Sequence, residues 1–94
     1  MSTDQPGPVD GSLGYRLDSQ VALRPEPFGA LAYHYGNRRL TFLRSPHLVS
    51  LVRDLEQHDN VDDALAASGI EPARWDNYRR ALGSLAASEV IHAR

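Results

Sequence analysis

The chain has 94 residues, of which 41% are hydrophobic and 23% charged, and its formal net charge is −2. This length favours one domain around one hydrophobic core, and the slightly negative charge argues against non-specific binding to nucleic acid. Because the sequence contains no cysteine, disulfides, thiolate nucleophiles and cysteine-ligated metal centres are excluded.

The N-terminal fourteen residues are polar and rich in glycine and proline. We predict that residues 1–14 form a disordered tail, because packing would not offset the entropy lost on ordering them. The domain then comprises residues 15–94. The start of the chain lacks the features of a secretion signal, and no apolar run is long enough to span a membrane. We therefore expect a cytoplasmic protein with no membrane partner.

Three short β-strands are predicted before any helix. The first covers residues 20–24 and is ended by Pro25-Glu26-Pro27. Residues 29–35 and 38–43 flank Gly36-Asn37, a dipeptide suited to a two-residue hairpin turn with positive φ. Sequential hairpins place the second strand in the middle, so the third strand is predicted to be an edge.

A two-residue turn determines which residues of this hairpin face each other. One face would carry three apolar-rich pairs: Tyr35 with Arg38, Tyr33 with Leu40, and Leu31 with Phe42. The other face would carry a smaller and more polar set: Ala30 with Leu43, Ala32 with Thr41, and His34 with Arg39. A slip of one residue would exchange the faces, so we expect burial of the apolar face to hold this register.

Two helices are predicted directly after the strands. Ser45 caps the first, with Pro46 at its first position and apolar residues at helical spacing up to His58. Asn60 caps a short second helix that ends at Gly69. Both helices therefore have residues at their ends that favour the start or the end of a helix.

The third helix is predicted to begin at Pro72 and to end near Ser88. Its apolar stripe repeats at steps of three and four residues: Trp75, Tyr78, Leu82 and Leu85. Strands followed by helices indicate an α+β fold. We expect a three-stranded antiparallel β-meander followed by three α-helices, in a winged helix-turn-helix-like arrangement.

No residues show the pattern of a catalytic or metal site. The histidines are scattered rather than paired at the spacing of ligands: His34, His47, His58 and His92. Asp62-Asp63 is explained by the positive first turn of the second helix, and no serine lies in a nucleophile elbow. We therefore predict that the chain is not an enzyme and requires no metal and no cofactor.

The unpaired edge at residues 38–43 suggests a binding function. A peptide would add to it as a further strand, with side chains held between the sheet and a neighbouring helix. The simpler interpretation is that Arg38, Arg39 and Arg44 protect the edge from aggregation. A third alternative is pairing with a second copy, which would give a weak homodimer through the edge strand.

The order of elements also fits a small winged-helix DNA-binding regulator. The third helix, however, places Arg74, Asn77, Arg79 and Arg80 beside Asp76 and a wide apolar stripe, which is a poor surface for base edges. We keep this function as the alternative and expect no nucleic-acid partner.

Several stretches resemble the peptide chaperones of mycofactocin biosynthesis. They are residues 21–31 (VALRPEPFGAL), 33–36 (YHYG), 39–43 (RLTFL), 78–82 (YRRAL) and 85–88 (LAAS), within a similarity that covers about residues 15–91. This resemblance implies a RiPP recognition element of the PqqD-like class. Such a domain holds the leader of a ribosomally made precursor peptide and delivers it to a radical SAM maturase, without catalysis or a cofactor.

In that class the leader lies antiparallel against the third strand, in a groove shared with the third helix. By position, the resemblance places peptide binding on Arg38, Arg39, Leu40, Thr41, Phe42 and Leu43 of the strand, and on Trp75, Tyr78, Arg79 and Leu82 of the helix. Leaders of this system tend to be acidic, which implies a steering role for the arginines, Arg80 included. If the N–H of Thr41 faces the leader, proline there should weaken binding without unfolding the domain.

Overall fold

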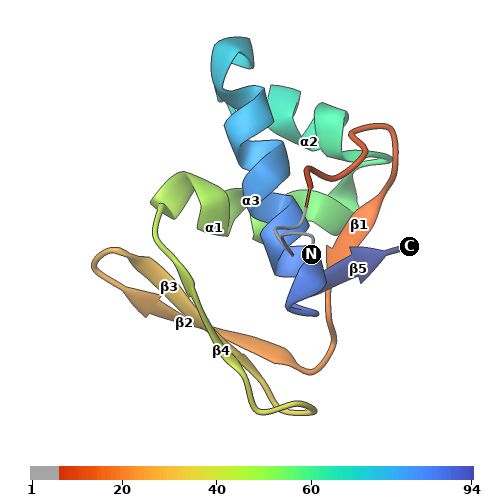
Figure 1. Cartoon of the computed structure of the whole chain (residues 1–94). Coiled ribbons are helices and arrows are strands. Elements are labelled where there is room, and N and C mark those ends of the chain that lie inside the picture. Colours follow the sequence, from red (N-terminus) through yellow and green to blue (C-terminus); the bar gives the residue numbers. More distant parts are fainter. Residues whose placement is uncertain (1–6) are drawn as a thin grey trace, which may run out of the picture.

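The computed structural model describes residues 7–94 (Figure 1). The strands are β1 (Tyr15–Leu17), β2 (Val21–Glu26), β3 (Gly29–His34), β4 (Leu40–Leu43) and β5 (Ile91–Ala93). The helices are α1 (Pro46–Asp54), α2 (Val61–Ala67) and α3 (Trp75–Ala87), with 3-10 turns at Leu55–Gln57 and Pro72–Arg74. The predicted α+β fold, an antiparallel three-stranded sheet followed by three helices, is confirmed.

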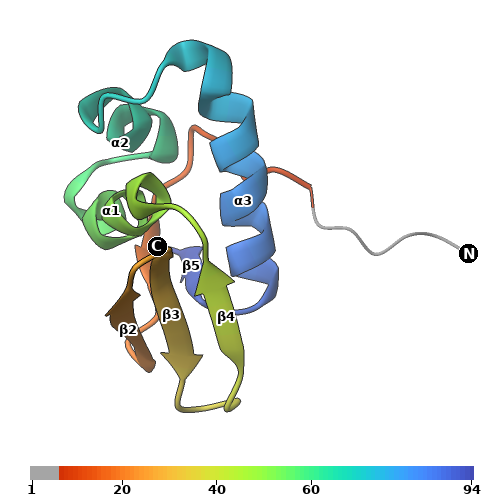
Figure 2. The same cartoon turned by 90° about the vertical axis from the view of Figure 1, so that its left-hand side faces the viewer.

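The larger sheet has the order β2-β3-β4, so the predicted meander and the edge position of the third strand are confirmed. Figure 1 shows the three helices on one side of this sheet, and Figure 2 shows α3 toward the end of the sheet that β4 forms. Strands β1 and β5 were not predicted. They pair antiparallel as a separate ribbon, with Tyr15 opposite Ala93, and each is too short to show alternation in the sequence.

The predicted register of the β3-β4 hairpin is confirmed, but the predicted turn is wrong. Tyr33 lies opposite Leu40 as expected. The last bonded pair before the turn, however, is His34 with Arg39, so the turn has four residues, 35–38, and the positive φ falls on Arg38 (63°). The reason lies in His34, whose Nδ1 accepts hydrogen bonds from the backbone N–H groups of Gly36 (3.0 Å) and Asn37 (3.1 Å). A buried side chain therefore satisfies the donors of the turn.

The face of the hairpin that is buried is the opposite of the expected one. Ala30, Ala32 and Leu43 are each at most 1% exposed, whereas Leu40 is 59% and Phe42 51% exposed. The core is filled from the helix side by Leu48, Leu51, Val52, Leu55, Leu65, Leu82 and Leu85. Because these side chains already occupy most of the space, the two alanines of the middle strand allow α1 to pack closely against β3.

The predicted helix caps are confirmed. Ser45 Oγ accepts a hydrogen bond from the N–H of Leu48 (3.3 Å), and Asn60 Oδ1 accepts one from the N–H of Asp63 (2.8 Å). Gly69 follows α2 with a φ of 81°, a conformation that glycine adopts without a steric penalty. These local interactions set where α1 and α2 begin and where α2 ends.

Residues 7–14, which belong to the stretch predicted to be a disordered tail, contact α2 and α3, and residues 1–6 lie outside the described residues. Val9 is 7% exposed, and its N–H donates to the carbonyl of Arg79 (3.0 Å). The carbonyls of Gly11 and Leu13 accept from the first N–H groups of α2 (3.0 Å each). These donors have no partner inside a helix, so the segment orders by satisfying them, which composition alone does not reveal.

Candidate functional site

The outer edge of β4 is the central feature of the site. Within residues 7–94, β4 pairs with β3 alone. The N–H of His34 donates to the carbonyl of Arg39 (3.0 Å), so position 39 is bonded to β3. Hydrogen bonding alternates along an antiparallel pair, and the backbone groups of Thr41 and Leu43 therefore also face β3.

The N–H and C=O groups of Leu40 and Phe42 consequently point away from β3, along the free edge. The carbonyl of Leu43 lies against Gly29 on the β3 side, which agrees with this alternation. An added strand would pair with positions 40 and 42, whose backbone groups have the spacing of an antiparallel ladder. The N–H of Thr41 faces β3 and not the free edge. The prediction that proline at this position would weaken leader binding therefore does not apply, because it required an outward N–H.

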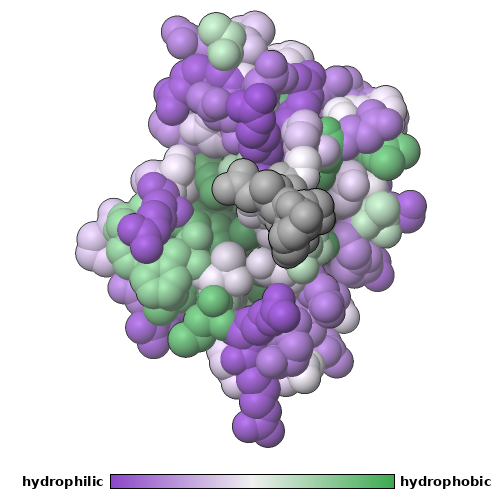
Figure 3. All heavy atoms as spheres, viewed as in Figure 1, coloured by the Kyte–Doolittle hydropathy of each residue, from purple (hydrophilic) through white to green (hydrophobic). Residues whose placement is uncertain are grey.

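A groove lies between the start of α1 and α3, next to the end of β4. It holds a pocket of about 170 Å³ lined by Ser45, Leu48, Arg74, Asn77, Tyr78 and Ala81. Figure 3 shows a hollow with an apolar floor in this region. A peptide paired with β4 could direct alternate side chains into this groove, because successive side chains of a strand point to opposite faces.

The predicted strand residues fall into two groups. Arg38, Arg39, Leu40 and Phe42 are exposed, and Thr41 is half-buried on the helix side of the sheet. Leu43 is 0% exposed and belongs to the core. The side chain of Leu43 therefore cannot contact a peptide in this conformation.

The predicted helix residues lie mostly on another side of α3. Tyr78 alone among them lines the groove, where the Arg74 guanidinium sits 5.7 Å from its ring centroid. Leu82 is fully buried, and the indole N–H of Trp75 donates to the carbonyl of Ile70 (2.8 Å). Trp75 therefore lies at the margin of the core, where its indole N–H reaches a backbone partner.

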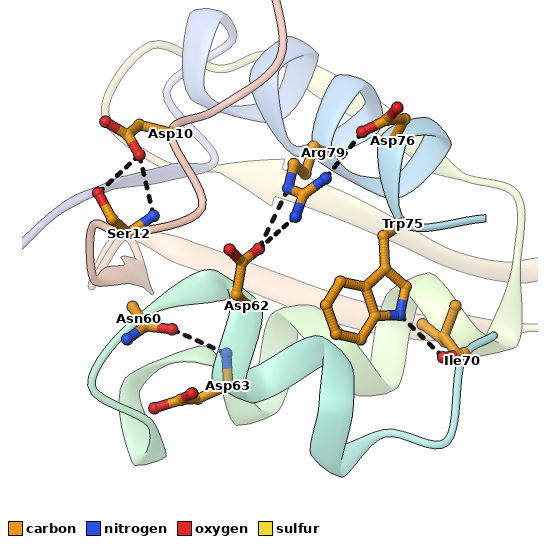
Figure 4. Close-up of polar contacts among 9 residues, drawn as sticks. All are labelled: Asp10, Ser12, Asn60, Asp62, Asp63, Ile70, Trp75, Asp76 and Arg79. Atoms are coloured by element: carbon orange, nitrogen blue, oxygen red, sulfur yellow. Dashed lines mark hydrogen bonds and ion pairs between the residues drawn. The ribbon is translucent and has the colours of Figure 1, made fainter. Parts of the chain in front are cut away.

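Arg79 connects α3 to α2 instead of facing the groove (Figure 4). Its guanidinium contacts Asp62 of α2 at 2.8 Å and Asp76 at 2.7 Å, and it lies 5.8 Å from the ring centroid of Trp75. The hydrogen bonds to Asp62 hold the pKa of Arg79 above its usual value. A nearby loop is closed by Asp10, whose pKa is lowered by hydrogen bonds from Ser12 (Figure 4).

Arg79→Ala should lower the free energy of unfolding by about 1–2 kcal/mol, because two partly exposed ion pairs and packing of the alkyl stem against Trp75 are lost. If the chain binds a leader peptide at β4, as the resemblance implies, the affinity for that peptide should stay within twofold. Thermal denaturation and a binding titration measure the two quantities. The matched control is Arg80→Ala, at an exposed neighbouring position, for which we expect a change below about 0.5 kcal/mol. A stable Arg79→Ala protein that no longer binds peptide would contradict this role.

The groove wall contains three helix-side residues that were not predicted to belong to the site. Arg74, Asn77 and Ala81 share one face with the predicted Tyr78, at steps of three and four residues from the 3-10 turn into α3. This spacing is visible in the sequence, but the helix residues of the site were assigned by the position of the third helix in the resembled family. Burial of the apolar stripe around Leu82 leaves the more polar neighbouring face for the groove.

The described N-terminal segment leaves this groove open. A Cβ atom on Gly83 would overlap the carbonyl of Gly7, so residues 7–9 lie close against α3 at that point. At 3.6 residues per turn, Gly83 is about 200° around the helix from Ala81. The segment therefore contacts the side of α3 opposite to the groove.

Other site classes find little support in the described part of the chain. Among residues 7–94, no three histidine or acidic side chains are placed to hold a metal ion together. None of the described helices has the length and apolar character needed to cross a membrane. The free edge and its groove are thus the features that need a functional explanation.

Comparisons with known proteins identify the family. The chain is 44% identical over 85 residues to the peptide chaperone MftB of Mycobacterium ulcerans, covering 90% of this chain and 78% of that protein. It is 43% identical to MftB of Mycolicibacterium smegmatis and 40% to that of Mycobacterium tuberculosis, each over 82 residues, covering 87% of this chain and 80% and 75% of those proteins. No solved structure matches the chain. The model of the peptide chaperone MftB family matches residues 14–92, and the chain belongs to this family.

Proposed function

We propose that this peptide chaperone captures the leader of a ribosomally synthesised precursor by strand addition to β4 and presents it to a radical SAM maturase, without catalysis. The family provides the chaperone role in mycofactocin biosynthesis. The binding mode rests on one observation: the free edge of β4 lies next to the groove between α1 and α3. Strand addition needs an unpaired edge and a side-chain pocket next to it, and both are present.

In the proposed complex the leader forms a fourth strand next to β4. Its backbone pairs with the outward groups of Leu40 and Phe42. One set of its side chains enters the groove near Tyr78 and Ala81, and the alternate set lies beside the exposed rings and alkyl groups of the outer face. Sub-micromolar affinity corresponds to roughly 8–10 kcal/mol, which a few buried side chains and a short ladder can supply.

Charge favours an acidic leader at this edge. Residues 20–45 contain four arginines and one glutamate, a net charge of +3, so the remainder of the chain carries −5. Arg38 and Arg39 are exposed at the start of β4, and Arg44 is exposed at its end. Exposed charges of this kind raise the rate of association with an oppositely charged partner more than they raise the final affinity.

The alternatives are less well supported by this geometry. In an edge-to-edge homodimer, antiparallel pairing of two β4 strands would bring Arg38 and Arg39 of one copy towards Arg44 of the other, which is repulsive. For DNA binding, α3 would have to offer several free cations, but one of its two arginines, Arg79, is held by Asp62 and Asp76. Neither alternative explains the groove.

Amide hydrogen exchange tests the binding mode residue by residue. Addition of a synthetic leader should slow exchange at the N–H groups of Leu40 and Phe42, which point outward. Exchange at Thr41 and Leu43 should change less, because these groups are already bonded to β3. The measurement is two-dimensional NMR of labelled protein with and without saturating leader. Equal protection at all four positions, or at none, would rule out strand addition in this register.

A further inference from the structure

The outer face of the β2-β3-β4 sheet, on the side away from the helices, carries most of the exposed large apolar residues. Among the described residues these are Leu13, Phe28, Tyr35, Leu40 and Phe42, and all but Leu13 lie on this sheet or its turns. Phe28 stacks on Phe42 at 5.8 Å between ring centroids, and Tyr33 meets Tyr35 edge-on at 5.0 Å. Contiguous apolar surface of this kind on a soluble domain marks a site of contact with another protein.

The same face is concave over β2 and β3. A hollow of about 380 Å³ is lined by Ala22, Leu23, Arg24, Pro25, Leu31, Tyr33, Tyr35 and Leu40. Leu31 and Tyr33 belong to β3, the middle strand of this surface, and each side chain is only half-buried. A protruding side chain of a partner protein would bury these groups, and such central apolar anchors supply much of the binding energy in interfaces.

A leader bound at β4 leaves most of this hollow uncovered. Neighbouring strands are about 4.8 Å apart, so β3 would lie about 10 Å from an added strand and β2 about 14 Å. Side chains of the leader can reach Leu40 and Phe42 but not Ala22 or Arg24. Most of the hollow is therefore a second surface, which shares Leu40 with the edge that holds the peptide.

The charges around this face indicate what it accepts. Arg24 lies opposite Leu31, its side chain is 74% exposed, and it forms an ion pair with Glu26 (2.8 Å). The guanidinium of Arg44 lies 5.3 Å from the ring centroid of Phe42. With Glu26 counted, residues 20–45 still carry a net charge of +3. A second copy would bring the same positive rims together, at a cost from like-charge repulsion. Complementarity requires instead a partner whose apolar contact surface is bordered by carboxylates.

We propose that this outer sheet face docks the maturase, through an apolar surface of that enzyme bordered by acidic residues, while the β4 edge holds the leader. This inference rests on the proposed function, in which the chaperone contacts peptide and enzyme together. Two surfaces on one sheet explain how a domain without catalytic residues brings a peptide to an enzyme: one edge binds the leader, and the adjacent face sets the position of the enzyme.

Two variants at one position test the docking face. Tyr33→Asn removes the ring from the hollow, and Tyr33→Asp has the same shape but adds a negative charge. We expect affinity for the purified maturase to fall about tenfold with Asn and at least threefold further with Asp at low ionic strength. The affinity for the leader peptide should stay within twofold. Calorimetry with each partner alone measures both, and amide NMR spectra establish that the variants are folded. If either variant fails to fold, Arg24→Glu at an exposed rim position should weaken maturase binding at least threefold.

The outcomes separate this inference from the proposed function. Unchanged maturase affinity in folded variants would overturn the docking face while leaving leader capture intact. Equal loss of leader and maturase affinity would also overturn it, because the two surfaces would not be separate. A wild-type protein that binds leader but not maturase would contradict presentation itself. A wild-type dimer by light scattering that Tyr33→Asn converts to monomer would assign the face to a second copy and overturn the proposal.

Discussion

Leu43→Ala should destabilise the domain by about 2–5 kcal/mol, whereas Leu40→Ala should change the free energy of unfolding by less than about 0.5 kcal/mol. The two leucines lie three residues apart on β4, yet Leu43 is 0% and Leu40 59% exposed. Truncating Leu43 leaves a cavity beside the alanines of β3 and the leucines of α1. Truncating Leu40 removes surface that is already largely in water.

Chemical denaturation of both variants measures this difference directly. For a domain of this size, each 1 kcal/mol shifts the melting temperature by about 4–8 °C. The comparison tests which face of the hairpin packs against the helices. Similar destabilisation by the two substitutions, or a larger effect at Leu40, would mean that the apolar outer face is buried after all.

Leu40→Pro should weaken leader binding about tenfold and leave the domain folded, while Thr41→Pro should destabilise the fold itself. The N–H of Leu40 points to the free edge, where proline is tolerated in a strand. Losing this donor removes a hydrogen bond worth up to about 1.5 kcal/mol, and a factor of ten corresponds to about 1.4 kcal/mol. The N–H of Thr41 instead bonds to β3, so proline there leaves a carbonyl of the sheet without its partner, at a cost of about 1–3 kcal/mol.

The control for this pair is Leu40→Ala, which shortens the side chain but keeps the N–H group. Its leader affinity should therefore be closer to wild type than that of Leu40→Pro. Calorimetric titration gives the affinities, and thermal denaturation gives the stabilities. Normal stability of Thr41→Pro, together with lost leader binding, would place the outward N–H groups at odd-numbered positions and contradict the alternation derived from His34 and Arg39.

The order of the elements and the free edge follow from sequence because they depend on local signals. Ser45, Asn60 and Gly69 favour helix ends through interactions within a few residues. The turn residues between two β-prone runs predict a hairpin. The third strand is then an edge, since a meander leaves its last strand without a second neighbour. The family resemblance, carried by stretches such as residues 21–31, is now supported by the family model.

The register of the hairpin was also predictable, although the form of its turn was not. Cross-strand pairing depends on the separation of residues about the turn, and Tyr33 opposite Leu40 satisfies either a two-residue or a four-residue connection. What selects the longer turn is the buried ring of His34, whose acceptor nitrogen serves two backbone donors. Burial of that ring is a consequence of the whole fold.

Tertiary structure alone decided which face of the sheet is buried and which side of α3 borders the groove. A two-residue alternation shows that a strand has two faces, but the volume supplied by the opposing helices determines which of them fits. Leu51, Leu55 and Leu82 fill the core from the helix side, so the alanines of β3 turn inward and the larger apolar residues stay outside. Residues 7–14 show the same limit. They are ordered by hydrogen bonds to N–H groups of α2, which are far away in the sequence, and no local pattern predicts these bonds.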